Sequence, residues 1–136
     1  MKVHGSCHCG SVRYEAEIDP ARVTICRCTD CQALTGSAYR VSVPVSKDDF
    51  VLQAGTPTIY VKTAESGARR AQAFCGNCGS PLYTHAAVDP SSYGLRVGCI
   101  DERRLLTPAK QVWCRSALPW SMNTEALPRH EKESSG

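Results

Sequence analysis

Residues 12–18 read Val12-Arg13-Tyr14-Glu15-Ala16-Glu17-Ile18, with an apolar side chain at every even position and a charged one at every odd position. This period of two predicts a β-strand with one face in the core and the other in solvent. Asp19 and Pro20 follow at once and end the strand. A second alternating run at 39–45 predicts another strand, and Pro44 within it predicts a position at the edge of a sheet.

The rest of the chain shows the same strand-rich character. Apolar runs at 50–52 and 59–61 flank the turn signal at 54–57, which predicts two strands joined by a hairpin or a corner. Only residues 29–34 and 101–106 look helical, and both segments are short. Further strands are expected at 70–74, 80–85, 93–100 and 111–115. Many short strands separated by turns predict an all-β fold, in the manner of a small sandwich or barrel.

Composition describes an ordinary globular chain of 136 residues, with 42% hydrophobic and 21% charged residues. We expect one domain over residues 1–125 and a polar, disordered tail over 126–136. The formal charge of +3 is small and its basic residues are dispersed, so nucleic acid and anionic membranes are not expected as partners. The N-terminal residues lack the apolar run of a secretory signal, and no membrane-spanning stretch follows, which predicts a cytoplasmic, reducing environment.

Cysteine is the unusual component, with nine residues, an odd number that excludes complete internal disulfide pairing. Seven of them fall into three short motifs. These are Cys7-His8-Cys9-Gly10, Cys26-Arg27-Cys28-Thr29-Asp30-Cys31 and Cys75-Gly76-Asn77-Cys78-Gly79. In such knuckles the chain turns tightly so that two sulfur atoms converge on one metal, and we expect Gly76 and Gly79 to supply the positive φ angles of the turn.

A metal is the best interpretation of these motifs. A redox-active CxxC pair normally opens a helix within a βαβ unit, and the sequence shows no such unit. Thiolate-rich intracellular sites of this spacing mostly bind zinc, with iron as the minor alternative. The remaining two, Cys99 and Cys114, are interpreted as small buried core residues.

Seven clustered thiolates are one short of two closed four-cysteine sites, so we expect two zinc ions in different environments. The simplest partition pairs the two short knuckles in a structural zinc site of Cys7, Cys9, Cys75 and Cys78. The second zinc is then held by three thiolates and keeps one open position, which is the general pattern of a catalytic site. Its ligands are Cys26, Cys28 and Cys31. Cys99, Cys114 or a histidine could instead close the fourth position, although His4, His8 and His85 lie nearer the other cluster in sequence.

A zinc ion with three thiolate ligands favours a soft incoming ligand, such as a substrate thiol that binds as the thiolate. The natural chemistry is attack of that thiol on a carbonyl, or the reverse cleavage of a C–S bond. The short helix expected at 29–34 would direct N–H groups at the thiolates. Arg27 is either a counter-charge or a solvated turn residue, and Arg13, Arg27 and Arg40 are candidates to bind substrate carboxylates.

At these motifs the sequence resembles the glutathione-dependent formaldehyde-activating enzyme family, also called the centromere protein V/GFA family. The resemblance extends over residues 3–120. The matching stretches are His4 to Gly10 with Val12-Arg13-Tyr14-Glu15, Cys26 to Gln32 with Thr35-Gly36-Ser37, Phe74 to Tyr83, and Pro119-Trp120. The chain departs from the family pattern at Lys110-Gln111-Val112-Trp113, where many members have a histidine.

The resemblance implies a β-tent of packed antiparallel sheets with the two zinc sites assigned as above. It also implies a carbon–sulfur lyase or synthase that joins glutathione, or a similar small thiol, to formaldehyde as S-(hydroxymethyl)glutathione, with the thiol sulfur at the second zinc. A non-catalytic, zinc-stabilised β module that binds a thiol or a protein ligand is the alternative.

Overall fold

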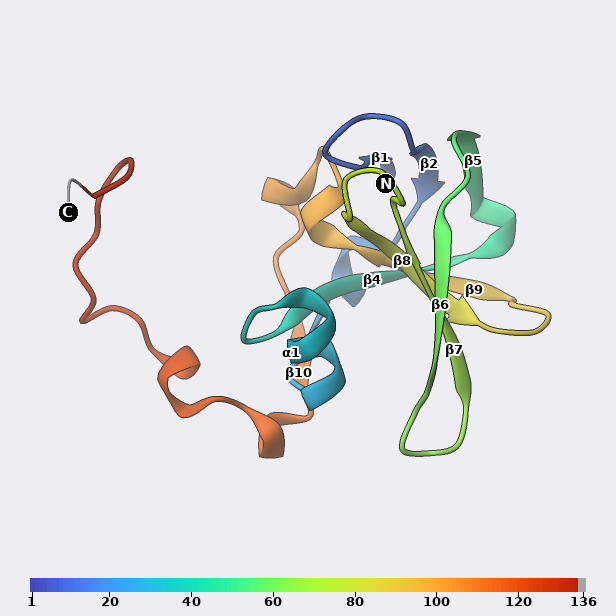
Figure 1. The fold of residues 1–136 in the computed structure, drawn as a ribbon. Coiled ribbons are helices and arrows are strands. Elements are labelled where there is room, and N and C mark those ends of the chain that lie inside the picture. Colours follow the sequence, from blue (N-terminus) through green and yellow to red (C-terminus); the bar gives the residue numbers. More distant parts are fainter. Residues whose placement is uncertain (135–136) are drawn as a thin grey trace.

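The computed structural model describes residues 1–134, and within that range it contains two β-sheets and one α-helix (Figure 1). The smaller sheet has the order β1-β2-β5, with bounds β1 (Lys2–Ser6), β2 (Arg13–Glu17) and β5 (Phe50–Ala54). The larger sheet has the order β10-β3-β4-β9-β8-β7-β6. Its bounds are β10 (Lys110–Val112), β3 (Thr24–Cys26), β4 (Arg40–Ser46), β9 (Ser92–Arg96), β8 (Pro81–Ala86), β7 (Arg69–Phe74) and β6 (Thr58–Thr63). The predicted all-β class is therefore confirmed.

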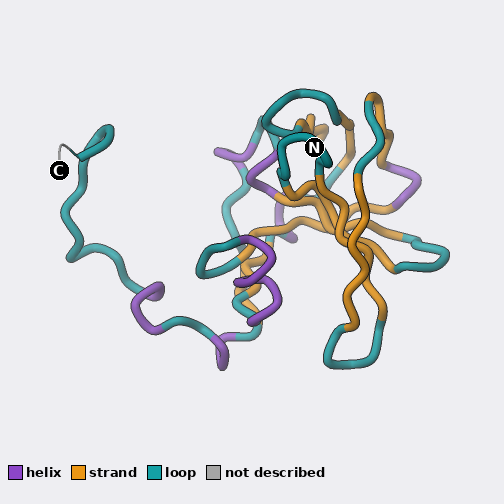
Figure 2. Tube along the Cα trace, in the orientation of Figure 1, coloured by secondary structure: helices purple, strands orange, loops and turns teal. Residues whose placement is uncertain are grey.

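Helical structure is confined to short segments, as Figure 2 shows. The α-helix α1 (Thr29–Thr35) occupies the predicted helical segment and ends at Gly36, which adopts a left-handed conformation. The remaining helical pieces are single 3₁₀ turns at Pro20–Arg22, Lys47–Asp49, Val97–Cys99, Arg103–Leu105, Cys114–Ser116 and Pro119–Met122. Two of them shorten the strands expected at 93–100 and 111–115, because the backbone there leaves the sheet.

The segments expected to form a hairpin or a corner form a corner. β5 pairs with β2 in the smaller sheet, whereas β6 pairs with β7 at the edge of the larger one. The turn at Gly55 therefore carries the chain from one sheet to the other. Gly55 has a φ of 79°, and a side chain there would meet the carbonyl of Ser11.

The prediction that Pro44 puts its strand at a sheet edge is wrong, because β4 lies between β3 and β9. The physical reason is the shortness of β3, whose pairing with β4 extends only from Cys26↔Arg40 to Thr24↔Ser42. Pro44 lies beyond this pairing and opposite Gly94 of β9. The missing N–H of proline is thus tolerated where β4 has a partner strand on one side only.

The core lies between the smaller sheet and one face of the larger sheet. Val43, Leu95 and Ala73 contribute that face from β4, β9 and β7. Aromatic rings join the two sheets, since Phe50 of β5 lies with its ring centroid 5.1 Å from Tyr83 and 4.7 Å from Tyr93. Burial of these rings supplies a large share of the hydrophobic stabilisation in so small a domain.

The opposite face of the larger sheet is polar. Three neighbouring strands place directly opposed residues on this face, namely Gln72 of β7, Thr84 of β8 and Gly94 of β9. Arg96 and Ser42 form a further opposed pair in β9 and β4. α1 lies over this polar face in Figure 1, on the side of the sheet away from the core.

Residues 123–134 contain no helix or strand and run away from the sheets in Figure 1. Part of the tail predicted at 126–136, residues 135 and 136, lies outside the described residues. Among the helices of residues 1–134, none is long and apolar enough to cross a bilayer.

Gly5 of β1 lies opposite Tyr14 of β2, and a Cβ at this position would overlap the tyrosine ring. Tyr14 is fully buried and cannot move away without opening the core. We therefore expect Gly5→Ala to lower the free energy of unfolding by about 1–3 kcal/mol or more, as overpacking of a core does. Urea denaturation at constant zinc concentration measures the change.

Gly98→Ala is the matched control, since a Cβ there meets nothing within 4 Å. An unfolding midpoint of Gly5→Ala equal to that of Gly98→Ala would show that Tyr14 does not pack over Gly5 as described.

Candidate functional site

Two backbone turns with the same hydrogen-bond pattern carry the first group of cysteines. The N–H of Cys7 donates to the carbonyl of Val12 at 3.1 Å, and the N–H of Cys75 donates to the carbonyl of Ser80 at 3.0 Å. The first turn connects β1 to β2 and the second connects β7 to β8. They touch where the N–H of His8 donates to Ser80 Oγ at 3.0 Å. Each sheet therefore contributes one turn to the same site.

Glycine is needed in these turns for two different reasons. Gly10 and Gly79 have φ angles of 82° and 81°, which only glycine adopts without strain. The predicted positive φ of Gly76 is wrong, because that residue is absent from the left-handed region. Gly76 instead provides space, since a Cβ there would lie 2.5 Å from Thr58 Oγ1 of the neighbouring strand.

The structure brings the sulfur atoms of Cys7, Cys9, Cys75 and Cys78 within 4.8 Å of one another. Cys9 Sγ lies 3.6 Å from Cys7 Sγ and 3.7 Å from Cys75 Sγ. Four thiolates around zinc at about 2.3 Å form a tetrahedron with edges of about 3.8 Å, so the donor set and spacing fit a closed zinc site. Cys7 and Cys75 are buried in the core, while Cys9 and Cys78 are exposed.

Hydrogen-bond donors surround these sulfur atoms and favour their thiolate form. The N–H of Val12 lies 3.2 Å from Cys7 Sγ, and Ser11 Oγ lies 3.1 Å from Cys9 Sγ. The hydrogen bond from Ser11 is the main reason that the pKa of Cys9 falls to about 5. These donors thus stabilise the deprotonated thiolate, which is the form in which cysteine binds a metal.

The second group consists of Cys26, Cys28 and Cys31, whose sulfur atoms also lie within 4.8 Å of one another. Cys26 ends β3, Cys28 caps the N-terminus of α1, and Cys31 lies in the first helical turn. The N–H of Cys31 donates to Cys28 Sγ at 3.3 Å, which is the helix-terminus contact that the sequence predicted. A hydrogen bond with Cys31 lowers the pKa of Cys26 to about 5, and the same bond raises the pKa of Cys31.

Contacts from three directions hold α1 over the sheet. Gln32 Nε2 donates to the carbonyls of Arg27 and Ser116, at 2.9 and 3.0 Å. Lys62 of β6 forms an ion pair with Asp30 at 3.0 Å. The helix and the second cysteine group therefore have one fixed position relative to the strands.

Arg27 has a structural role that the sequence did not reveal. Its side chain is only 5% exposed, so it is not a solvated turn residue. The guanidinium donates to Gln111 Oε1 at 2.9 Å and Ser121 Oγ at 2.8 Å, and it lies 4.8 Å from the centroid of the Tyr39 ring. Gln111 of β10 is thus engaged in binding Arg27.

Cys99 and Cys114 lie outside both sulfur groups. Cys99 is only half-buried, packed against the border of the core rather than inside it, and its sulfur donates to the carbonyl of Pro81 at 3.0 Å. The core position expected for Cys114 is wrong, because its side chain is exposed in the 3₁₀ turn that follows β10. No histidine among residues 1–134 joins either group, and His4 pairs with Glu102 at 2.8 Å.

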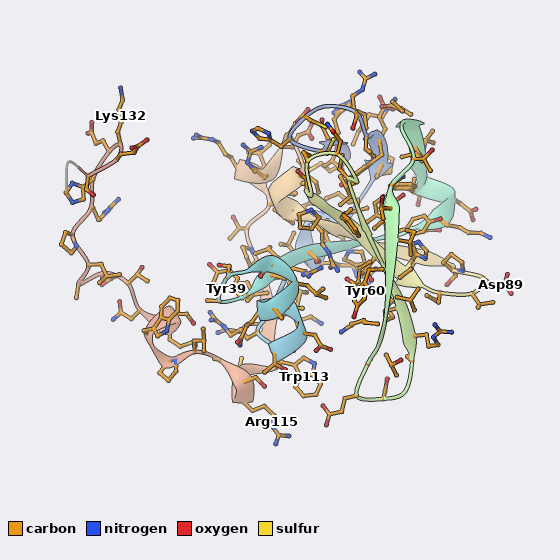
Figure 3. The ribbon with its side chains drawn as sticks, in the orientation of Figure 1. Tyr39, Tyr60, Asp89, Trp113, Arg115 and Lys132 are labelled. Atoms are coloured by element: carbon orange, nitrogen blue, oxygen red, sulfur yellow. The ribbon has the colours of Figure 1, made fainter. Side chains whose placement is uncertain are left out.

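A cavity of about 350 Å³ opens beside the second group, at the N-terminal end of α1. Cys28 forms part of its wall. Asp30, Lys62 and Glu65 supply charged groups, and Trp113 lies at the same end of α1 in Figure 3. The cavity gives a small molecule access to the second cysteine group, and none of the four cysteines of the first group lines it.

The fold and the two sulfur groups define a small β protein with two possible metal centres, and a solved structure shares its architecture. A crystal structure of a Rhodobacter sphaeroides protein, a structural genomics target, is similar with a TM-score of 0.62 and 22% sequence identity. The match covers 82% of this chain and 100% of that chain. The family model of the glutathione-dependent formaldehyde-activating enzymes matches residues 2–116. The chain belongs to this family.

Removal of one metal-binding cysteine should have different effects in the two sulfur groups. Cys78→Ser should release one metal ion and unfold the domain, because binding of a structural zinc is folding free energy, about 10 kcal/mol or more in peptides. Cys28→Ser should release the other ion and leave a folded protein. Metal content by mass spectrometry and circular dichroism together measure both effects. Equal loss of structure in the two variants would contradict this division between the groups.

A double variant Cys99→Ala/Cys114→Ala examines whether either residue completes the second site. Both lie outside the sulfur groups, so the purified variant should retain the full metal content of the wild type. Loss of one equivalent of metal would show that the second site is a closed, structural one.

Proposed function

We propose that this protein catalyses the addition of glutathione, or a similar small thiol, to formaldehyde and the reverse cleavage of the adduct. Membership of the formaldehyde-activating family supports the reaction class. The observation that carries the proposal is the second group of three sulfur atoms, which has no fourth protein ligand among residues 1–134 and borders a cavity through Cys28. Cys26, Cys28 and Cys31 are the proposed metal ligands, and the substrate sulfur takes the fourth position.

The reaction forms one C–S bond. The thiol sulfur adds to the formaldehyde carbon as the π bond of the carbonyl and the S–H bond break, and the proton lost from sulfur ends on the oxygen of the hydroxymethyl product. A zinc ion held by the three cysteines would act as a Lewis acid that lowers the pKa of a thiol in its open position. The first turn of α1 supports this charge, since the N–H of Cys31 is directed at Cys28 Sγ.

Other residues of the cavity supply charge next to the cysteines and groups that can accept the thiol proton. Lys62 lowers the pKa of Cys26 in addition to the larger effect of the hydrogen bond with Cys31, and its ion pair with Asp30 fixes its position. Asp30 and Glu65 are the carboxylates of the cavity wall, and we propose that they accept the thiol proton and return it to the product. Gln111 takes no part, because its side-chain oxygen binds Arg27.

Zinc-edge X-ray absorption with and without glutathione tests the open position. Before glutathione is added, the average zinc should have fewer than four sulfur neighbours, because one of two sites holds three. Addition of glutathione should raise the average toward four. If both zinc ions have four protein sulfur ligands from the start, the proposed mechanism is excluded.

Turnover is measured separately, as the rate of S-(hydroxymethyl)glutathione formation above the uncatalysed rate at low formaldehyde concentration. Cys28→Ser should reduce the rate to the background, whereas Cys114→Ser, which changes an exposed thiol outside both groups, serves as the control. Binding of glutathione at the zinc without any rate enhancement would instead support the non-catalytic binding module.

A further inference from the structure

Two arginine side chains lie on the polar face of the larger sheet, close to the second cysteine group. Arg40 of β4 is the direct cross-strand neighbour of Cys26 of β3. Arg96 of β9 is opposite Ser42, two positions further along β4, and therefore lies on the same face. Arg40 is only 5% exposed, which is unusual for a residue whose charge needs compensation.

The two guanidinium groups share a single acceptor. Arg96 Nη2 donates to Gln72 Oε1 at 2.8 Å, and Arg40 Nη1 reaches the same oxygen at 3.4 Å. Arg96 also donates to Ser42 Oγ at 2.8 Å. Arg40 Nε is buried and has no hydrogen-bond partner. The pair thus retains donor capacity that the protein itself does not use.

Neither arginine forms an ion pair with a carboxylate of residues 1–134. The result is electrostatically unfavourable, because two buried like charges lie together without a neutralising partner. Burial, and then the charge of Arg40, lower the pKa of Arg96 to about 9. An arrangement of this kind is stabilised when an anion enters.

Arg40 lines two cavities next to α1. One has a volume of about 410 Å³ and is also lined by Leu34 and Tyr60, and the other has a volume of about 380 Å³ and is also lined by Tyr39 and Arg96. Figure 3 shows Tyr39 and Tyr60 on opposite sides of α1. A small ligand in the second cavity would therefore contact both arginines, because both line it.

The cysteine group alone does not balance these charges. Three thiolates around a divalent ion have a net charge of −1, which offsets one guanidinium and leaves the other. Lys62 forms an ion pair with Asp30. Arg70 adds a further positive charge, which also lowers the pKa of Arg96. One negative charge is still required on this face of the sheet.

We propose that Arg40 and Arg96 form a carboxylate-binding subsite, which selects thiols that carry a carboxylate over neutral or cationic thiols. The substrate class rests on the proposed function, in which the thiol sulfur lies at Cys26, Cys28 and Cys31. A carboxylate accepts two parallel hydrogen bonds from a guanidinium, so it satisfies the unused donors and the uncompensated charge together. Gln72 holds the two arginines at the correct spacing through its shared oxygen.

The test compares ligands that differ in one group. S-methylglutathione has both carboxylates but no free thiol, and cysteamine has a thiol but no carboxylate. Calorimetry on the zinc-loaded protein should give an affinity for S-methylglutathione that falls about ten-fold or more in Arg40→Gln and in Arg96→Gln. The affinity for cysteamine should stay within two-fold of the wild type in both variants.

Arg69→Gln is the matched control, since it removes the same charge from an exposed position on β7. It should leave the affinity for S-methylglutathione unchanged. An equal loss of affinity for S-methylglutathione in all three variants would overturn the proposal, because general electrostatic attraction would then explain it. A parallel loss for cysteamine in Arg40→Gln would also overturn it, because the arginine would then act on the sulfur site.

A ligand-side measurement avoids dependence on variants that fail to fold. The diethyl ester of S-methylglutathione lacks both carboxylate charges, and the wild-type protein should bind it about ten-fold or more weakly than the free acid. Equal affinities would exclude the subsite. X-ray absorption could show that no glutathione sulfur binds zinc while the protein still prefers the free acid to the ester. That pair of results would reject the proposed function and keep the subsite.

Discussion

The structure depends on the meeting of two turns, each from a different sheet. Cys9 and Cys75 are 66 positions apart in the chain, yet their sulfur atoms are 3.7 Å apart. Cys7 and Cys75 are also part of the hydrophobic core, so the sulfur group lies at the seam between the sheets. A metal ion bound there would tie the sheets together and restrict the unfolded chain, which matters in a domain whose core is modest.

This seam also determines where chemistry takes place. With one face of the larger sheet committed to the core, the opposite face is free to carry Gln72, Arg40 and Arg96, which a core could not accept. β3 brings Cys26 to the same face and leads directly into α1. The second cysteine group is therefore built on a sheet whose position the first group secures.

Sequence reasoning succeeded where the signal is local. The alternation at 12–18 and the helix at 29–34 follow from spacing within a few residues. The division of seven cysteines into groups of four and three follows from counting the motifs, and the structure brings the same groups together. Sequence reasoning failed where distant contacts decide: the short β3 makes a central position tolerable for Pro44, and Thr58 requires the small size of Gly76. The hydrogen bond from Arg96 to Gln72 also joins two separate strands, and no sequence motif predicts it.

The alternation of side chains along the strands separates the residues that maintain packing from the residues that determine ligand recognition. On β4, Val43 faces the core and its neighbours Ser42 and Pro44 face the other side of the sheet. Substitutions at the outward positions can alter what the protein recognises while the packing that keeps it folded stays the same. A family built on this scaffold can therefore diversify its ligands without rebuilding its architecture, as long as the residues at the seam are retained.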